Sequence, residues 1–421
     1  MNESIPNQTA SVISVADVEY VKDLYPRLKP NDDAIERYRD AVDCLPPIVV
    51  ARGRVLVDGY HRWQAHRRED RETVQAIDLG DLTDAEIFNE SIRRNAEHGQ
   101  QLSRSDKKSL AGKLWQTKAH LPNAERTAEI MSLLAVSERA VQDWTKGARS
   151  DEKKAAQEKA WDLWLDCVEQ KDIAVSVGVS EASVSGWFKE RKSALSESDA
   201  PESRQHFDVW QFATTNKDSG SQSYFGAIPP QVVENLLWFY TDPGDVVMDL
   251  FAGSGTTIDV AKRMGRRVWA ADIRGDHYSP HLPIHKHDAT QGWPEEAPSK
   301  AKLLLLDPPY WKQAQGRYSS EDNELGEMDL DRFYESWRTV LQAAHGKAER
   351  VAYIISPTQN EDGSVVDHAT DMLRAAWDIG FTVERRIIVT YSTQQATGQQ
   401  VTWARDNKRM LKLYRDLVVL R

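Results

Sequence analysis

Hydrophobic and polar positions follow three successive patterns along the chain. Over residues 16–100, short apolar runs alternate with charged stretches of helical spacing, whereas residues 101–193 contain few glycines and have helical spacing throughout. From about residue 207 onward, apolar runs of strand length alternate with helical patterns, which is typical of a mainly parallel sheet covered by helices. The patterns therefore predict an α+β domain, an all-α region and a C-terminal α/β domain.

Polar segments mark the expected boundaries between these parts. Residues 1–15 are polar and predict a flexible tail, and residues 194–206 are rich in serine and acidic residues, which predicts a linker. The predicted domains are therefore 16–100, 101–193 and 207–421. A chain of 421 residues has room for two or three domains.

The run LLLLDPPYW at residues 303–311 combines a core pattern with polar chemistry. Four leucines predict a buried strand, which has to stop before Pro308 and Pro309 because proline has no N–H to give a sheet. Asp307 is then at the carboxyl end of the strand, where ligands collect in open α/β sheets. A carboxylate, a rigid turn and the ring of Tyr310 together predict a ligand site.

A glycine-rich stretch, DVVMDLFAGSGTTIDVAKRMG at residues 245–265, predicts a strand, a tight turn and a helix. Gly253 and Gly255 allow the backbone to turn sharply and to approach a ligand closely. The next strand ends on Asp272, about 20 residues after the first glycine, which is the spacing at which an acid meets a ribose. The stretch is therefore predicted to be a βαβ nucleoside-binding unit.

Several motifs resemble those of the amino-DNA methyltransferases. DLFAGSGTT resembles their motif I, which binds S-adenosylmethionine, and DPPY resembles motif IV, the catalytic motif. IPPQVVENLL at residues 228–237 resembles the segment that closes over the methionine part of the cofactor. RMLKLYRDLVVL at residues 409–420 resembles their closing strand hairpin. The resemblance covers residues 207–421, although FAGSGTT is most familiar in the group whose two motifs have the opposite order.

The resemblance implies a Rossmann-like fold that methylates an exocyclic amine of a base. Asp307 and the carbonyl of Pro308 would accept the hydrogens of the amine, Pro309 would hold the turn rigid, and Tyr310 would stack on a base flipped out of the duplex. No metal is required. Adenine N6 is favoured, cytosine N4 is the alternative, and RNA is a further alternative substrate. The cofactor residues implied are Ile228, Pro229, Asp249, Leu250, Phe251, Ala252, Gly253, Ser254, Gly255, Thr256, Thr257, Asp272, Asp288 and Ala289.

The N-terminal part contains a second candidate ligand site. Residues 44–68 predict two short strands around Arg52-Gly53 and then a helix, whose N-terminus could meet an anion. Gly59, Arg62 and Ala65 match the Gly-x-x-Arg-x-x-Ala box of the ParB-type partition proteins, which this region resembles. The resemblance implies a pocket for CTP or another nucleotide. The candidate pocket residues are Gly59, His61, Arg62, Arg93 and Arg94.

Two interpretations of this ParB-like region stay open. Tyr60 and His61 replace variable positions of a box that is richer in arginine in the partition proteins. The region is therefore either a nucleotide site or a scaffold that has kept the fold without the nucleotide. His61 is likewise either a pocket residue or a surface histidine.

Two segments, 126–149 and 172–192, have the pattern of a helix-turn-helix. Between residues 93 and 149 there are eleven Lys or Arg against six Asp or Glu, although the whole chain has a formal charge of −11. A local basic excess favours double-stranded DNA as partner, and a charged face on a helical bundle is the alternative. The candidate DNA-binding residues are Arg139, Trp144, Lys146, Ser183 and Lys189.

The remaining composition limits the class of protein. Cys44 and Cys167 are isolated, so the sequence supports neither a disulfide framework nor a cysteine-based metal site. There is no apolar run long enough to span a membrane and no signal-peptide pattern. We therefore expect a cytoplasmic, nucleoid-associated protein without a membrane partner, and a homodimer is an open alternative.

The lengths of the catalytic segments predict a division of labour. Only residues 312–331 separate Trp311 from the next helix, and the loop 392–408 is the other polar segment that could contact DNA. Neither is large enough to read several base pairs, so the N-terminal half is expected to choose the site. The alternative from another class is a ParB-like DNA-binding regulator whose methyltransferase fold has become a scaffold.

Overall fold

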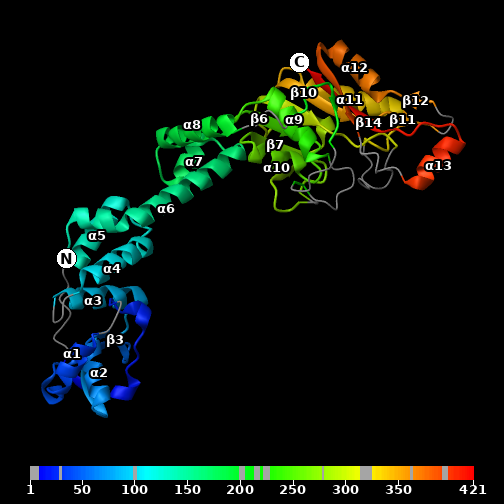
Figure 1. Cartoon of the computed structure of the whole chain (residues 1–421). Helices are drawn as coiled ribbons and strands as arrows, with labels where there is room; N and C mark the ends of the chain where they lie inside the picture. The colour runs from blue at the N-terminus through cyan, green and yellow to red at the C-terminus, as the bar shows by residue number, and fades with distance from the viewer. Residues whose placement is uncertain are drawn as a thin grey trace. The chain divides into compact units, whose positions relative to one another are not determined.

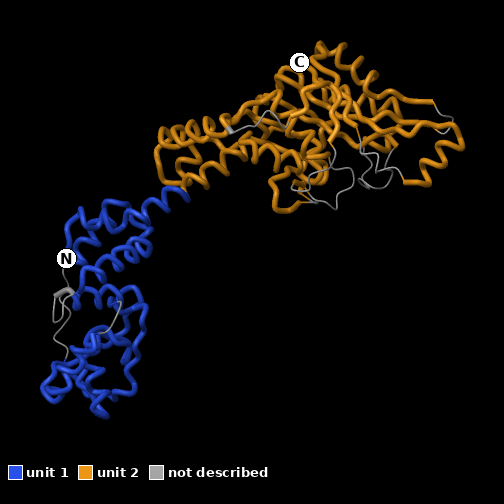
Figure 2. The backbone as a smooth tube through the Cα atoms, in the orientation of Figure 1, with its two compact units in different colours: residues 1–155 blue, residues 156–421 orange. Residues whose placement is uncertain are grey.

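The computed structural model confirms a multidomain protein of mixed α/β architecture (Figure 1). The residues that it describes are 9–27, 31–97, 102–198, 204–212, 219–220, 228–276, 279–312, 325–360, 364–390 and 397–421. Two compact units comprise residues 1–155 and 156–421 (Figure 2). Within the described ranges, no helix is long and apolar enough to cross a membrane.

Unit 1 contains a four-stranded sheet with the strand order β1-β4-β2-β3. Its strands are β1 (Ser11–Ser14), β2 (Ile48–Ala51), β3 (Val55–Asp58) and β4 (Thr73–Asp78). Its helices are α1 (Asp32–Arg39), α2 (Tyr60–Arg68), α3 (Asp84–Glu97), α4 (Arg104–Thr117), α5 (Asn123–Leu134) and the first part of α6 (Glu138–Leu165). β2 and β3 are apolar and almost fully buried, whereas β1 and β4 also carry exposed polar positions.

The hairpin predicted around Arg52-Gly53 is confirmed. β2 and β3 pair antiparallel, and Arg52 and Gly53 both have positive φ, of 50° and 75°, as a tight hairpin turn requires. The predicted tail is corrected, because residues 11–14 form β1 and pair with the outer side of β4. The edge of β4 offers free backbone groups, which the polar segment satisfies even though its side chains are mostly exposed.

Helices α4, α5 and the start of α6 pack around a core of their own. Trp115, Leu114, Ile130, Leu134 and Val141 are all buried there. α5 ends where Ala135 takes a left-handed conformation, and α6 begins three residues later at Glu138. α5 and α6 are therefore two consecutive helices joined by a short turn.

Unit 2 is built on an eight-stranded sheet with the order β5-β13-β14-β10-β9-β6-β7-β8. Its strands are β5 (Val209–Trp210), β6 (Val246–Asp249), β7 (Arg267–Asp272), β8 (Ile284–Lys286), β9 (Ala301–Leu306), β10 (Ala348–Ile355), β13 (Val383–Thr390) and β14 (Tyr414–Leu420), with a separate pair β11 (Thr358–Gln359) and β12 (Val365–Val366). β14 runs antiparallel to both of its neighbours, and the other ladders of the large sheet are parallel.

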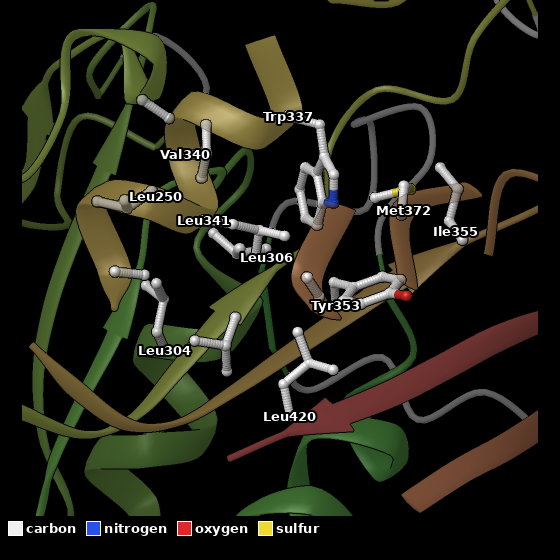
Figure 3. Packing of buried hydrophobic residues seen from close by; sticks show 14 of the residues in the cluster. Leu250, Leu304, Leu306, Trp337, Val340, Leu341, Tyr353, Ile355, Met372 and Leu420 are labelled. Carbon is white, nitrogen blue, oxygen red and sulfur yellow. The ribbon is translucent and has the colours of Figure 1, made fainter. Parts of the chain in front are cut away.

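Helices cover both faces of this sheet. The helices of unit 2 are α7 (Gln170–Val177), α8 (Glu181–Ser198), α9 (Pro230–Tyr240), α10 (Thr256–Arg263), α11 (Leu330–Ala344), α12 (His368–Ile379) and α13 (Gly398–Asp406). Of these, α9 and α10 pack on one face of the sheet, and α11 and α12 pack on the other. The four leucines of β9 show why both faces need cover. Leu304 and Leu306 pack with Trp337 of α11 and Tyr353 of β10 (Figure 3), whereas Leu303 and Leu305 point into the opposite core with α9 and α10. All four leucines of this central strand are therefore buried, two on each face.

Helices α7 and α8 belong to unit 2, and the end of α6 together with α8 contacts the sheet domain. Arg267 of β7 donates to the carbonyl of Trp164 at 3.3 Å, and Lys262 forms an ion pair with Asp166 at 2.5 Å. Leu195 of α8 lies against Gly265, where an added Cβ would come within 2.4 Å of it. The predicted linker is therefore corrected, because residues 194–198 continue α8 and anchor it. The helices predicted as one region, 101–193, are divided between the two units.

Candidate active site

Three carboxyl groups lie at the carboxyl edge of three adjacent strands. Asp249 ends β6, Asp272 ends β7, and Asp307 directly follows β9. These strands are neighbours in the sheet and run parallel, so their carboxyl ends face the same side. The strand that stops before the two prolines is confirmed, since β9 ends at Leu306.

The glycine-rich turn connects two of these carboxyl groups. Gly253 N–H donates to Asp272 at 3.0 Å, and Phe251 N–H donates to Asp249 at 2.9 Å. Gly255 caps α10 with φ 85°, and a Cβ on it would lie 2.3 Å from Leu282. The turn therefore requires glycine at this position and is held by the acids that were predicted to meet a ligand.

Burial disfavours the charged form of all three acids. It raises the pKa of Asp249 to about 7, although the Thr257 hydroxyl and the Phe251 amide act against the shift. Burial also raises the pKa of Asp272, and it raises that of Asp307 to about 6 against the opposing charge of Arg415. Carboxyl groups of raised pKa at one edge form a site that a cation would stabilise.

Asp307 is linked to the far end of the chain through Tyr310. The Tyr310 hydroxyl donates to Asp307 Oδ1 at 3.1 Å, and Arg415 Nη1 donates to the same hydroxyl at 3.3 Å. Asp307, which is predicted to accept from the target amine, and Tyr310, which is predicted to stack on the base, are therefore brought together. Pro308 is buried beside them and Pro309 is partly buried, and Gly326 lies close enough that its added Cβ would touch Pro309.

A chain of hydrogen bonds supports the turn from behind. Thr358 donates to the carbonyl of Trp311 at 3.1 Å, and His368 Nε2 lies 3.0 Å from the Thr358 hydroxyl. Tyr334 contacts His368 Nδ1 at 2.9 Å. Burial lowers the pKa of His368 to about 4, so the ring is neutral, with one nitrogen that donates and one that accepts. The Tyr334 hydroxyl also donates to Asp371 at 3.1 Å. Trp311 itself is buried and donates to the carbonyl of Met328, so its role is packing.

The other predicted cofactor residues lie around the same edge. Ile228 is buried, and Pro229 precedes α9 as its cap. Asp288 accepts from both the amide and the hydroxyl of Thr290. Asp288 thereby caps the short helix Ala289–Gln291. The turn and helix-start residues predicted for the loop are partly or fully buried, namely Leu250, Phe251, Ala252, Ser254, Thr256, Thr257 and Ala289.

The candidate nucleotide residues of unit 1 are only partly brought together. Gly59 caps α2 with φ 97°, and Arg62 beside it forms a 2.9 Å ion pair with Asp58. His61 is buried rather than on the surface, and its Nε2 accepts from the Asn31 amide at 3.0 Å. Burial, together with the nearby charge of Arg27, lowers the pKa of His61 to about 4, so the ring is neutral.

Two predicted arginines of this region have a different partner. Arg93 and Arg94 both pair with Glu90 on α3. The next residue, Asn95, accepts from Arg27 at 3.2 Å. Arg27 therefore reaches the surroundings of His61, and the sequence contains no box that would have identified it.

The candidate DNA-binding residues lie on two helices in different units. Arg139 and Lys146 are exposed on α6 of unit 1, seven residues apart and therefore on the same face, whereas Trp144 is partly buried against the core of α4 and α5. On α8 of unit 2, Ser183 and Lys189 are exposed, and the Ser183 N–H donates to the Ser180 hydroxyl just before the helix.

Sequence reasoning missed Arg415 and the Thr358–His368–Tyr334 chain. The available signal was weak: Arg415 and Asp416 are charges inside an otherwise apolar strand. Both are buried, and Asp416 pairs with Arg386 at 2.9 Å. A charge pair in the middle of a strand pattern thus indicated a polar site at that strand.

Comparisons with known proteins find both DNA methylases and a transcriptional regulator similar to parts of this chain. A family model described as a DNA methylase matches residues 90–279, which include the glycine-rich loop and end before Asp307. Type II methyltransferase M1.MboII of Moraxella bovis is 29% identical over 83 residues, covering 18% of this chain and 32% of its own. Transcriptional regulator NovG of Streptomyces niveus is 36% identical over 77 residues, covering 18% and 24%.

A solved structure similar to this chain is the truncated chromosome-partitioning protein ParB of Caulobacter crescentus in complex with its centromeric site. The two are 19% identical with a TM-score of 0.25, over 41% of this chain and 96% of that one. The chain spans between 20% and 32% of the length of the curated methyltransferases that it matches. Over residues 90–279 the chain is therefore similar to DNA methylases, and an α/β sheet with a glycine-rich loop is the class of fold that carries the site.

Proposed function

We propose that the protein transfers a methyl group from S-adenosylmethionine to an exocyclic amine of a DNA base. The observation that supports this proposal most strongly is the carboxyl edge of unit 2. There Asp307 and Tyr310 stand next to a glycine-rich turn held by Asp249 and Asp272. The same edge thus combines a nucleoside-type loop with an acceptor and an aromatic ring.

The residues at this edge fit the cofactor by charge and by shape. S-adenosylmethionine, when bound, supplies a methyl group activated by a sulfonium cation. Desolvated acids with raised pKa values suit a cation better than an anion. Gly253 and Gly255 both have positive φ, of 50° and 85°, so the loop presents backbone rather than side chains to a ligand. Asp272 would hold the ribose, in addition to holding the loop.

Asp307 would act on the target amine by accepting its hydrogen. The lone pair of an exocyclic amine is delocalised into the ring, and two acceptors favour the geometry in which it attacks. The second acceptor would be the carbonyl of Pro308. In the free protein the Tyr310 hydroxyl occupies Asp307 Oδ1. Base binding would therefore require Tyr310 to release that oxygen while its ring stacks on the base.

Modification-sensitive sequencing of DNA from cells that express the protein tests the reaction and the base together. We expect N6-methyladenine at a defined motif, and cells expressing Asp307→Ala provide the control. N4-methylcytosine would support the alternative base. An unmodified genome, together with competition by tRNA for labelled methyl groups, would favour RNA as substrate. DNA binding without any transfer would favour the regulator with a scaffold fold.

Site selection would come largely from unit 1 and its exposed cations on α6. Because the end of α6 and α8 contact the catalytic domain, the fragment to compare with the full chain is 156–421, not one cut between residues 194 and 206. We expect this fragment to bind S-adenosylhomocysteine and to methylate DNA with relaxed preference, because Arg139 and Lys146 are removed. Equal rates at the same sites for fragment and full chain would place recognition in unit 2.

Unit 1 is proposed to bind a nucleotide such as CTP at the start of α2, with a nucleotide-free scaffold as the alternative. Gly59 is compatible with close approach of an anion, but Arg62 already pairs with Asp58. A DNA substrate would place the protein at the nucleoid in the cytoplasm. Sedimentation with and without CTP would show whether nucleotide binding drives dimer formation.

A further inference from the structure

Helix α13 lies on the same edge of the sheet as the candidate active site. β13 ends at Thr390 and runs in the direction of β9, and the antiparallel β14 starts at Tyr414. The segment between them therefore emerges at the carboxyl edge, where Asp307 stands. The residues that follow α13 contact the site. Lys412 donates to the carbonyl of Pro357 at 2.9 Å, and Arg415 donates to Tyr310. Figure 1 shows α13 as a separate short helix beyond the end of the sheet.

This helix exposes large apolar side chains. Val401 is 52% exposed, Trp403 is 57% exposed, and Met410, just after the helix, is 88% exposed. Ala404 is the buried residue of the helix. Amphipathic helices of globular proteins turn such side chains toward a core, whereas α13 turns them toward solvent. Val401 and Trp403 are two residues apart and therefore lie on different sides of the helix. Large apolar groups exposed on more than one side of a short helix indicate an element that contacts a partner.

The charges around these apolar residues are almost all positive. Residues 398–415 contain five cations and one acid, in a chain with a formal charge of −11. Arg405 pairs with that acid, Asp406, and both are well exposed. Lys408 has a left-handed φ of 51° and the Arg409 amide donates to the carbonyl of Ala404, so the chain turns sharply after the helix, where Lys408 is exposed and Arg409 is partly exposed.

The start of α13 is already satisfied by its own side chains. Thr397 and Gln400 form a reciprocal capping box, in which each side chain bonds to the backbone of the other. The helix N-terminus therefore does not define the partner. What does define it is the combination of an exposed tryptophan with flanking cations beside a site for a base, which is the chemistry of nucleic-acid contact.

We propose that the α13 surface, defined as Val401, Trp403, Arg405, Lys408, Arg409 and Met410, contacts duplex DNA next to the target base. Lys408 and Arg409 bind phosphates, and Trp403 packs against the stack that base flipping disturbs. This inference rests on the proposed function, since it assigns the DNA of that reaction to a surface of unit 2. Both units then contact DNA. Unit 1 selects the sequence, whereas α13 of unit 2 holds the duplex close to the target base.

The test compares the full-length protein with three variants on labelled duplex DNA and on S-adenosylhomocysteine. The variants are Trp403→Ala, the double variant Lys408→Ala plus Arg409→Ala, and a matched control, Trp377→Ala. Trp377 is 54% exposed near the end of α12, and α12 leads to the start of β13 at the opposite edge of the sheet. A second control neutralises Lys300 and Lys347, which are exposed just before β9 and β10 at that edge.

We expect Trp403→Ala to weaken DNA binding by on the order of tenfold, as loss of one stacking contact does. The double variant should reduce the logarithmic salt slope of DNA binding by about 1.8, or about 0.9 for each phosphate contact. Neither control should change either quantity, and affinity for S-adenosylhomocysteine should stay unchanged in all variants.

Unchanged DNA affinity and salt slope in both α13 variants would overturn the proposal. A change in sedimentation of Trp403→Ala without a change in DNA affinity would also overturn it, because the surface would then join copies of the chain. Failure of the proposed function has a different signature. In that case the wild-type protein would transfer no methyl group, whatever the α13 variants do to DNA binding.

Discussion

Two helices of this protein begin in the same way, yet the charges around their first turns differ in sign. Gly59 starts α2 in unit 1 and Gly255 starts α10 in unit 2, each with a left-handed backbone shortly after a strand. At Gly59 the neighbouring acid is neutralised by Arg62. At Gly255 the neighbouring acids are held by backbone amides and have raised pKa values. The comparison shows that a glycine turn allows close approach of a ligand, whereas the charges around it select the ligand.

The physical basis of the difference is the number of acids at each edge. In unit 2 three parallel strands place Asp249, Asp272 and Asp307 at one edge, where burial raises the pKa of each and the other two acids further raise that of Asp249. In unit 1 one acid stands at the end of β3, and Arg27 adds positive charge near His61. We infer that the first edge suits a cation and the second suits an anion.

The largest effect is expected from Asp307→Ala. It removes the carboxylate that is proposed to accept from the target amine mainly in the transition state. Single-turnover methylation should therefore fall by on the order of 10²–10³. Calorimetry should show that binding of S-adenosylhomocysteine stays nearly intact, because the glycine turn is held by the other two acids. Methylation within a few-fold of wild type would remove Asp307 from its assigned role.

The same edge explains how far the sequence could predict the site. The end of β9 follows from the missing N–H groups of two prolines, and the turn of α10 follows from its glycines, so both were predicted correctly. The contact between Arg415 and Tyr310 joins residues 105 positions apart. It depends on the pairing of β14 with β10, which no local pattern specifies.

The placement of α7 and α8 shows a second limit. Trp161 and Trp164 have the spacing of a core face on a self-contained helical bundle, and they do pack with Phe188 of α8. The same helices also contact Gly265 and Gly244 of the sheet domain. Those contacts form because two glycines leave space there, and a sequence pattern does not show which neighbour fills that space.

Substituting the two glycines would test whether they serve different ligands. Gly255→Ala places a Cβ within 2.3 Å of Leu282 and requires a left-handed alanine, which costs about 1–2 kcal/mol. We expect affinity for S-adenosylhomocysteine to fall by about tenfold. Gly59→Ala is the matched control and should leave that affinity unchanged while lowering the melting temperature of unit 1. Equal loss of affinity in both variants would contradict separate sites.

The pH dependence of the reaction should sharpen the contrast in charge. Asp307 has a pKa of about 6 in the free protein and has to be ionised to accept from the amine. The ratio kcat/KM should therefore fall about tenfold per pH unit below 6 and level off above it. A bound cation favours the carboxylate, so the acid limb of kcat should lie at lower pH than that of kcat/KM.

The control for this profile is nucleotide binding by unit 1. The pKa of His61 is about 4, so its ring stays neutral from pH 6 to 8 and binding should vary little over that range. Identical acid limbs for kcat and kcat/KM would indicate that no cation binds near Asp307. A kcat/KM that does not change between pH 5 and 7 would exclude Asp307 as the acceptor.

The smallest effect is expected from breaking the ion pair of Arg62 in unit 1. Arg62 and Asp58 are mostly buried and lie 2.9 Å apart, so an incoming phosphate has to compete with the carboxylate for the guanidinium. Asp58→Asn keeps the shape and removes the charge, and we expect it to strengthen CTP binding by a few-fold, whereas Arg62→Ala should abolish binding. Calorimetric titration of the full-length protein with CTP measures both. CTP binding by neither the wild type nor Asp58→Asn, while S-adenosylhomocysteine still binds, would show that the start of α2 in unit 1 is a scaffold without a nucleotide. The contrast in charge between the two glycine turns would then concern stability rather than a second ligand.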